Sequence, residues 1–348
     1  MENTAKDNVF IGGVEGGASS STAVIYDGSG KLLSECTGPS LNHWIIGMEE
    51  CQKRINDLIQ DAKQKADIPP ERSLNSLGLS LSGCEQESTN NDLKTGLIEK
   101  FDNLSKAYFV CSDTIAPVAS VSDEGGMVII SGTGSNALLR NPDGTVHQSG
   151  GWGHLLGDEG SAYWISWKAI KIVYDEQDDL QTPPADTSYV WKAIQNYFKI
   201  SSRFDILPHM YSSFNKSNVA GLCQHLAQGA EEGDALCLWI FREAGISLAK
   251  FLIALGKKSH KSLTEKDLGL PIVCVGSVWK SWKFLESGFK HEMDTNPLAV
   301  KKCSLIRLKV QVATGAVYLA AKNIDFDLPR TYENNYTLLY KYIKKKPL

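Results

Sequence analysis

The chain has 348 residues, of which 42% are hydrophobic, and a formal net charge of −4 at pH 7. This length predicts about two domains of ordinary size, and no apolar run is long enough to span a membrane. Basic residues are spread along the chain apart from the KYIKKKPL tail, which we interpret as a solvated end, so we expect no nucleic-acid partner.

Two segments, 9–35 and 127–148, share one pattern. Each has an apolar strand, a turn of glycine and hydroxyl residues, a second strand, an Asp-Gly hairpin turn and a third strand. Successive N–H groups in such turns form a concavity that binds anions. The alternative for a single turn is a plain hairpin with a glycine-rich bulge. Two turns in register favour phosphate binding and the plan of a two-lobed phosphotransferase.

Helices and further strands follow each repeat. The first half has a helix over 48–66, a strand over 76–83, a helix over 95–101 and a strand over 107–113; the second has helices across 162–256 and strands over 270–277 and 304–316. Helices between strands imply mixed sheets with a parallel portion, whose ligands gather at the carboxyl ends of the strands. Four polar residues are predicted at such ends: Ser82, Asp113, Ser277 and Thr314.

The expected boundary between the lobes lies near 116–125. This gives a small lobe over 1–118 and a large lobe over 119–329. A C-terminal helix over about 330–348 is expected to return to the first lobe.

Several polar residues have both a functional and a structural interpretation. Asp158, in GGWGHLLGDEGSAYWI (150–165), can accept two sugar hydroxyls, but it or Ser161 can equally cap the next helix. Asp113 can accept a proton from an attacking hydroxyl or simply start a turn. Spacing alone leaves both questions open. His154 is interpreted as structural.

Other site types are not favoured. The G-x-x-x-x-G-K-S/T pattern is absent, and no G-x-G-x-x-G opens a helix. None of the eight cysteines belongs to a C-x-x-C pair. We therefore expect buried thiols in a cytoplasmic protein rather than disulfides or a zinc site. The polar N-terminus, without a secretory pattern, agrees with a cytoplasmic location.

Taken together, the motifs resemble those of the N-acetylglucosamine kinases, in the BadF/BcrA-type branch of the acetate kinase–hexokinase–actin superfamily. The resemblance covers nearly the whole chain. It rests on GGVEGG (12–17), NHWIIG (42–47), SLGLSLSG (76–83), the Ser-Asp pair at 112–113, ISGTGSN (130–136), the 150–165 segment and CVGSVWKSW (274–282). It implies an α/β fold of duplicated actin- and hexokinase-like (ribonuclease H-like) lobes, with mixed five-stranded sheets around an interlobe cleft.

The resemblance also implies an activity, which is ATP- and Mg²⁺-dependent phosphorylation of the sugar 6-hydroxyl with Asp113 as general base. Residues that match the sugar side are Asn42, Trp44, Asp113, Gly151, Trp152, Gly153 and Asp158. Residues that match the nucleotide side are Gly16, Gly17, Ser19, Gly132, Thr133, Gly221, Gly276 and Ser277. Glu15 stands where the wider superfamily has Asp, so its expected contact with Mg²⁺ is through water. A homodimer is also expected.

One departure and two rival hypotheses remain. The first turn reads GGAS where relatives typically read GGGT, so Ala18 and Ser19 bring nucleotide affinity into question.

The first rival is a non-catalytic sugar sensor, which would need a DNA-binding or partner module. The second is a reductase-activating ATPase, which would need cysteines to hold an iron–sulfur cluster. The scattered cysteines give no cluster spacing.

Overall fold

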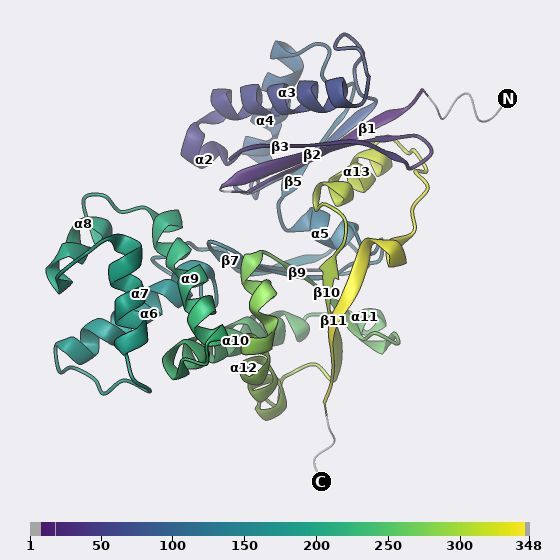
Figure 1. The fold of residues 1–348 in the computed structure, drawn as a ribbon. Coiled ribbons are helices and arrows are strands. Elements are labelled where there is room, and N and C mark those ends of the chain that lie inside the picture. The colour runs from purple at the N-terminus through teal and green to yellow at the C-terminus, as the bar shows by residue number, and fades with distance from the viewer. Residues whose placement is uncertain (1–7, 18, 345–348) are drawn as a thin grey trace. The chain divides into compact units, whose positions relative to one another are not determined.

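The computed structural model describes residues 8–17 and 19–344 and divides into two compact units (Figure 1). The first unit runs to Gly126 and includes Ile306–Leu339; the second comprises Met127–Leu305 and the residues from Tyr340. Ala18 lies outside the described residues. Within the described part of the chain, every helix is too short or too polar to cross a membrane.

The first unit is built on a five-stranded sheet of order β3-β2-β1-β4-β5. The elements are β1 (Phe10–Gly16), β2 (Ser20–Asp27), β3 (Leu32–Pro39), α2 (His43–Ile46), α3 (Met48–Lys65), β4 (Ser76–Leu81), α4 (Glu87–Lys100), β5 (Tyr108–Ser112), α5 (Ile115–Ala119), α13 (Ala313–Lys322) and η3 (Tyr332–Asn335). Strand β1 pairs antiparallel with β2 and parallel with β4, and β4 pairs parallel with β5. The predicted helix–strand alternation of this half is confirmed.

Helices cover both faces of this sheet (Figure 1). Helices α3 and α4 bury one face in an apolar core, and α13 packs on the other. The second contact depends on two glycines, because an added Cβ would lie 2.2 Å from the Ala313 carbonyl oxygen at Gly13 and 2.0 Å from that of Ala316 at Gly78. The backbone of α13 therefore rests directly on β1 and β4.

The second unit repeats the same strand order. Its elements are β6 (Gly126–Ser131), β7 (Ser135–Arg140), β8 (Val146–Gly150), α6 (Ala162–Gln177), α7 (Ser188–Phe198), η1 (Arg203–Ile206), α8 (Leu207–Met210), α9 (Lys216–Glu231), α10 (Ala235–Gly256), α11 (Lys261–Glu265), β9 (Leu270–Val275), η2 (Ser277–Ser281), α12 (Trp282–Thr295), β10 (Lys302–Leu308) and β11 (Tyr336–Ile343). The order β8-β7-β6-β9-β10 corresponds to β3-β2-β1-β4-β5, and β11 adds a sixth strand at the edge. The predicted duplication is confirmed.

Two sequence-based expectations are wrong. The segment expected as a C-terminal helix over 330–348 forms η3 and β11, as far as it is described. Its aromatic and β-branched residues suit a strand, and Tyr342 is buried with its hydroxyl on Met293 O (3.0 Å) and Asp294 Oδ1 (2.9 Å). Thr314 does not end a strand, because it lies in the first turn of α13 and bonds to Tyr26 Oη at 3.1 Å.

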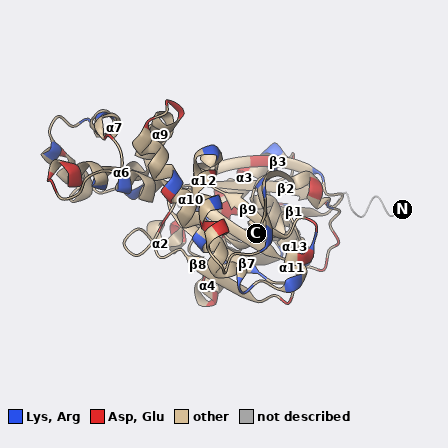
Figure 2. Cartoon of the chain, turned by 90° about the horizontal axis from the view of Figure 1, so that it is seen from below, with Lys and Arg blue, Asp and Glu red and all other residues tan. Residues whose placement is uncertain are grey.

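The state of the cysteines and the distribution of charged residues agree with the expectations from composition. All eight cysteines are free, and Cys111 alone among them is not fully buried, which confirms the prediction of buried thiols. Basic and acidic residues are interspersed along the helices and strands of both units (Figure 2).

We predict that Gly78→Ala destabilises the protein, because the new methyl group would collide with the backbone of α13. Overpacking of this kind costs about 1–3 kcal/mol or more. The measurement is the midpoint of thermal unfolding. Gly157→Ala is the control, since a Cβ there meets nothing closer than 3.5 Å. Equal midpoints for the two variants would contradict the close approach of α13.

Candidate active site

The first unit holds two carboxylates, those of Asp113 and Glu15, at the same edge of its sheet. Glu15 lies near the end of β1 in register with Ser80 of β4, which is in register with Cys111 of β5. Asp113 follows β5 directly and donates its N–H to Leu81 O at 3.2 Å. Both acids therefore lie at the carboxyl ends of parallel strands, where ligands of such sheets bind.

The surroundings of these acids disfavour their charged forms. Burial, and then repulsion from Glu85, raises the pKa of Asp113 to about 6, although hydrogen bonds from Ser112 and Ser82 oppose the shift. Burial, and then the charge of Asp113, raises the pKa of Glu15 to about 7. Two half-buried acids with raised pKa values are typical of proton-transfer and cation-binding sites.

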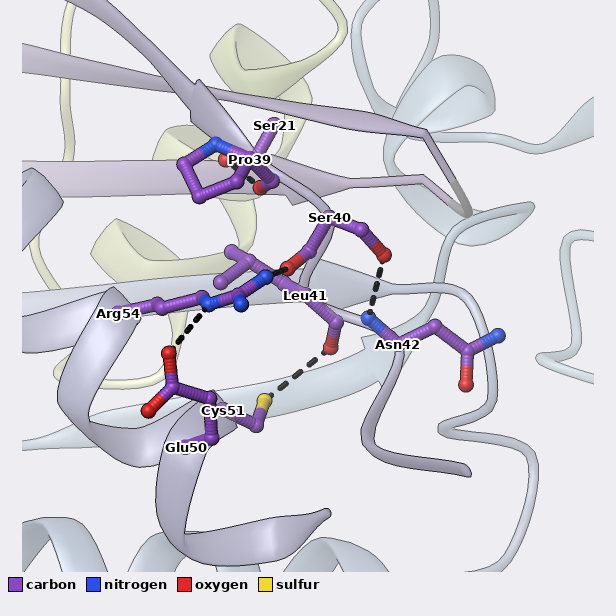
Figure 3. Close-up of polar contacts among 8 residues, drawn as sticks. All are labelled: Ser21, Pro39, Ser40, Leu41, Asn42, Glu50, Cys51 and Arg54. Atoms are coloured by element: carbon purple, nitrogen blue, oxygen red, sulfur yellow. Dashed lines mark hydrogen bonds and ion pairs between the residues drawn. The ribbon is translucent and has the colours of Figure 1, made fainter. Parts of the chain in front are cut away.

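The chain that leads to Asn42 is held at three successive carbonyls (Figure 3). Each accepts a side-chain hydrogen bond: Pro39 from Ser21 at 2.8 Å, Ser40 from Arg54 at 3.0 Å and Leu41 from Cys51 at 3.1 Å. Arg54 is itself fixed by Glu50 at 2.7 Å. This network holds the backbone that leads to Asn42.

Asn42 is linked to Asp113 through Ser82. The Asn42 side chain caps α2 by accepting from Trp44 N at 3.0 Å, and its Nδ2 donates to Ser82 Oγ at 3.3 Å. The Ser82 hydroxyl lies beside the Asp113 carboxylate, whose pKa it lowers. Trp44 bonds through Nε1 to Gly83 O at 3.1 Å, and 62% of its surface is exposed. Three predicted sugar-side residues thus lie around one strand end, joined by a serine that the sequence did not single out for a role.

The first glycine turn is closed by its own backbone. Gly17 N donates to Ser20 O at 2.9 Å, and Gly17 O accepts from Ser40 Oγ at 3.2 Å, which ties the turn to the segment before Asn42. Gly16 is required by packing, since an added Cβ would lie 2.6 Å from Leu81. Ser19 is exposed.

The second glycine turn, 131–135, is anchored to the segment 158–162. The bonds are Ser131 Oγ to Gly160 O at 2.8 Å, Ser135 Oγ to Glu159 O at 2.9 Å and Ala162 N to Gly132 O at 2.8 Å. No bond to the Thr133 hydroxyl is recorded in the described chain. Gly276, with φ +104°, approaches so closely that a Cβ would lie 2.2 Å from Ser131 O. The start of η2 at Ser277 therefore lies beside the turn.

Asp158 is a buried anchor of this turn. Its φ is +70°, its Oδ1 accepts from Ser135 N at 2.9 Å, and its Oδ2 pairs with Lys216 Nζ at 2.6 Å. Ser161 caps α6 by accepting from Trp164 N at 3.1 Å, so the capping alternative applies to Ser161 and not to Asp158. The predicted contact of Asp158 with a sugar stays a prediction.

The loop between β8 and α6 presents apolar side chains. Gly151 and Gly153 have φ of +81° and +76°, and Trp152 between them is 72% exposed. His154 stacks on Phe214 and meets Tyr163 edge-on, with ring centroids 5.0 and 5.1 Å away, which favours its structural interpretation.

Gly221 has a packing role that needs no nucleotide. It lies in α9, where a Cβ would meet the Tyr197 hydroxyl at 2.1 Å. Tyr197 Oη donates to Asn218 O at 2.6 Å and joins α7 to α9. The expected contact of Gly221 with the nucleotide remains a prediction.

Sequence reasoning missed Ser82, Glu85 and Lys216 as members of these constellations. Ser82 was recognised only as a strand end. Lys216 could not be found by pattern, because it comes from a helix far along the chain from the turn beside which it lies.

Comparison with known proteins places this fold in a defined class. A structure from Chromobacterium violaceum, assigned as an N-acetylglucosamine kinase, superimposes with a TM-score of 0.68 at 19% identity, covering 90% of this chain and 99% of that one. This similarity confirms the predicted fold class. The model of the BadF/BadG/BcrA/BcrD ATPase family matches residues 13–320, and the chain belongs to that family.

Two relatives carry more specific names. The N-acetylmuramic acid/N-acetylglucosamine kinase of Clostridium acetobutylicum is 27% identical over 330 residues, 91% of this chain and 99% of its own length. The N-acetyl-D-glucosamine kinase of Dictyostelium discoideum is 27% identical over 278 residues, 77% of this chain and 84% of its own.

The pKa of Glu15 leads to a prediction for stability against pH. A carboxyl whose pKa is higher in the folded than in the unfolded chain keeps its proton longer in the fold. Stability then falls as pH rises from about 4, where unfolded carboxyls ionise, to about 7, and levels off above that. Glu15→Gln should make this fall smaller, measured as the thermal midpoint across this range.

Glu99→Gln, which removes an exposed carboxyl of α4, serves as the control and should keep the wild-type slope. An unchanged slope in Glu15→Gln would show that Glu15 does not hold its proton in the folded protein.

Proposed function

We propose that this protein is an ATP-dependent kinase that phosphorylates the 6-hydroxyl of N-acetyl-D-glucosamine. The observation that carries the proposal is the linked set Asn42, Ser82 and Asp113 at the end of β4 and β5. It combines a hydrogen-bonding amide for a polyol with a carboxylate whose pKa suits proton transfer. The names of the two relatives support the amino sugar as substrate.

The proposed chemistry is in-line transfer with Asp113 as general base. An acid with a pKa of about 6 is mostly ionised at neutral pH yet basic enough to take a hydroxyl proton as the bond to phosphorus forms. Ser82 holds the carboxylate toward the amide that binds the sugar. The turn 131–135 offers N–H groups and the Thr133 hydroxyl to the phosphates, whose charge must be stabilised in the transition state.

The first unit fits an indirect contact with Mg²⁺. Glu15 and Asp113 are hard oxygen donors, and the charge of Asp113 helps to raise the pKa of Glu15. Mg²⁺ keeps most of its waters and binds through one or two carboxylates. The described residues contain no group of three or more His, Cys, Asp or Glu able to hold a metal. Mg²⁺ bound with ATP would supply neutralisation of phosphate charge, and Glu15 would hold it through water.

The rival hypotheses have less support. A sugar sensor would use Asn42 but would have no use for a base with a raised pKa. A cluster-bearing activator needs accessible thiols, whereas the cysteines are buried apart from the half-buried Cys111. From the resemblance we also propose a cytoplasmic homodimer, which light scattering of the purified protein would test.

The substrate assignment predicts a clear preference. N-acetylglucosamine should exceed glucose in kcat/KM, because an acetamide that pairs its N–H and C=O is worth about 2–4 kcal/mol over an analogue that leaves the site unpaired, or about 30- to 800-fold. The measurement is ADP release with ATP and Mg²⁺ against glucose, glucosamine, N-acetylmannosamine and N-acetylmuramic acid. Equal turnover of glucose would refute the assignment.

Asp113→Asn separates a base from a turn-forming residue. The amide keeps the shape and can still bond to the sugar, but it takes no proton at neutral pH. We expect kcat to fall by about 10²–10⁴-fold, with sugar affinity by calorimetry weakened less than about tenfold. Asp102→Asn, at an exposed position of the same unit, is the control. Near-normal kcat together with lower stability would leave Asp113 a structural role only.

A further inference from the structure

A lysine lies beside the second glycine turn, 131–135, which contains no basic residue. Neither GGVEGGASSS (12–21) nor ISGTGSN (130–136) contains Lys or Arg. Phosphoryl transfer usually draws on Lys or Arg as well as backbone N–H groups to stabilise charge. In the second unit such a cation comes from Lys216, the first residue of α9, which follows the cap Asn215.

The ammonium group of Lys216 is placed against the turn backbone. A Cβ on Gly134 would lie 3.0 Å from Lys216 Nζ and 2.7 Å from Asp158 Oδ1. The same Nζ pairs with Asp158 Oδ2 at 2.6 Å, and Asp158 Oδ1 accepts from Ser135 N at 2.9 Å. One carboxylate thus fixes the lysine and the turn to each other.

The two members of this ion pair differ in their access to solvent. The Asp158 side chain is 3% exposed, whereas that of Lys216 is 31% exposed. A lysine ammonium has three N–H donors, and within the described chain Asp158 is its recorded partner. Donors of the Lys216 ammonium therefore remain for an anion on the open side.

We propose that Lys216 binds the β- and γ-phosphates of the nucleotide at the turn 131–135, with Asp158 as the residue that positions it. The proposal rests on the nucleotide role proposed above for that turn. Lysine binds phosphate as a compact point charge. The competing explanation is that Lys216 only neutralises a buried carboxylate, which would be costly to leave unpaired.

The test compares Lys216→Met, Asp158→Asn and the double variant by calorimetry with ATP, ADP and AMP, without sugar. We expect Lys216→Met to weaken ATP binding by about tenfold or more and AMP binding by less than about twofold, because charge-assisted bonds to the outer phosphates are lost. Lys216→Arg should retain much of the ATP affinity. Lys168→Met, a half-buried lysine of the same unit, should leave all three affinities unchanged.

The double variant decides between the two explanations. It contains no unpaired buried charge, so it should regain the thermal midpoint lost in Lys216→Met but remain weak for ATP. Recovery of ATP affinity in the double variant, or parallel loss of AMP and ATP affinity in Lys216→Met, would overturn the proposal. If the wild-type protein binds neither ATP nor ADP, the nucleotide assignment fails with it. If the wild type and Lys216→Met bind ATP equally, only the role of Lys216 fails.

Discussion

The partial removal of water from two carboxylates is the constraint on which the first unit's site depends. Glu15 and Asp113 end up at one edge of the sheet because β1, β4 and β5 run parallel. Helix α13 can press its backbone onto this sheet because Gly13 and Gly78 lack side chains. The hydrogen bond from Ser82 then opposes the effect of burial on Asp113. The parallel pairing of β1, β4 and β5 therefore sets the positions of both acids.

The second unit has the same sheet topology but compensates the charge of its buried acid in a different way. Its buried acid, Asp158, pairs with Lys216 and accepts from the backbone N–H of Ser135, and these contacts hold a glycine turn. The corresponding turn of the first unit is held by Ser40, from the segment before Asn42. Duplicated sheets thus diverge at their turns, where few residues are fixed by the core.

Local signals in the sequence predict much of the fold and part of the candidate site. The hairpin turns, the amphipathic α3 and the wholly buried β4 follow from periodicity and from glycine. Asp113 could be selected as a strand end, whereas Asn42 was selected only by its resemblance to the family motif. Partners that lie far apart in the sequence could not be predicted in this way. Lys216 reaches its turn from a distant helix, and β11 is a strand only because the edge of β10 is available to pair with it. YTLLYKYI, taken alone, suits a helix nearly as well.

The path of the chain between its units has a consequence during synthesis. The first unit is completed only by Ile306–Leu339, and the second only by the residues from Tyr340. Until α13 leaves the ribosome, the face of the first sheet that holds Ile11, Val24 and Tyr26 has no cover. The first unit therefore cannot finish folding until most of the second has been made, and the nascent chain carries an exposed apolar face of its first sheet during that time. Such a surface is what chaperones bind and what favours aggregation.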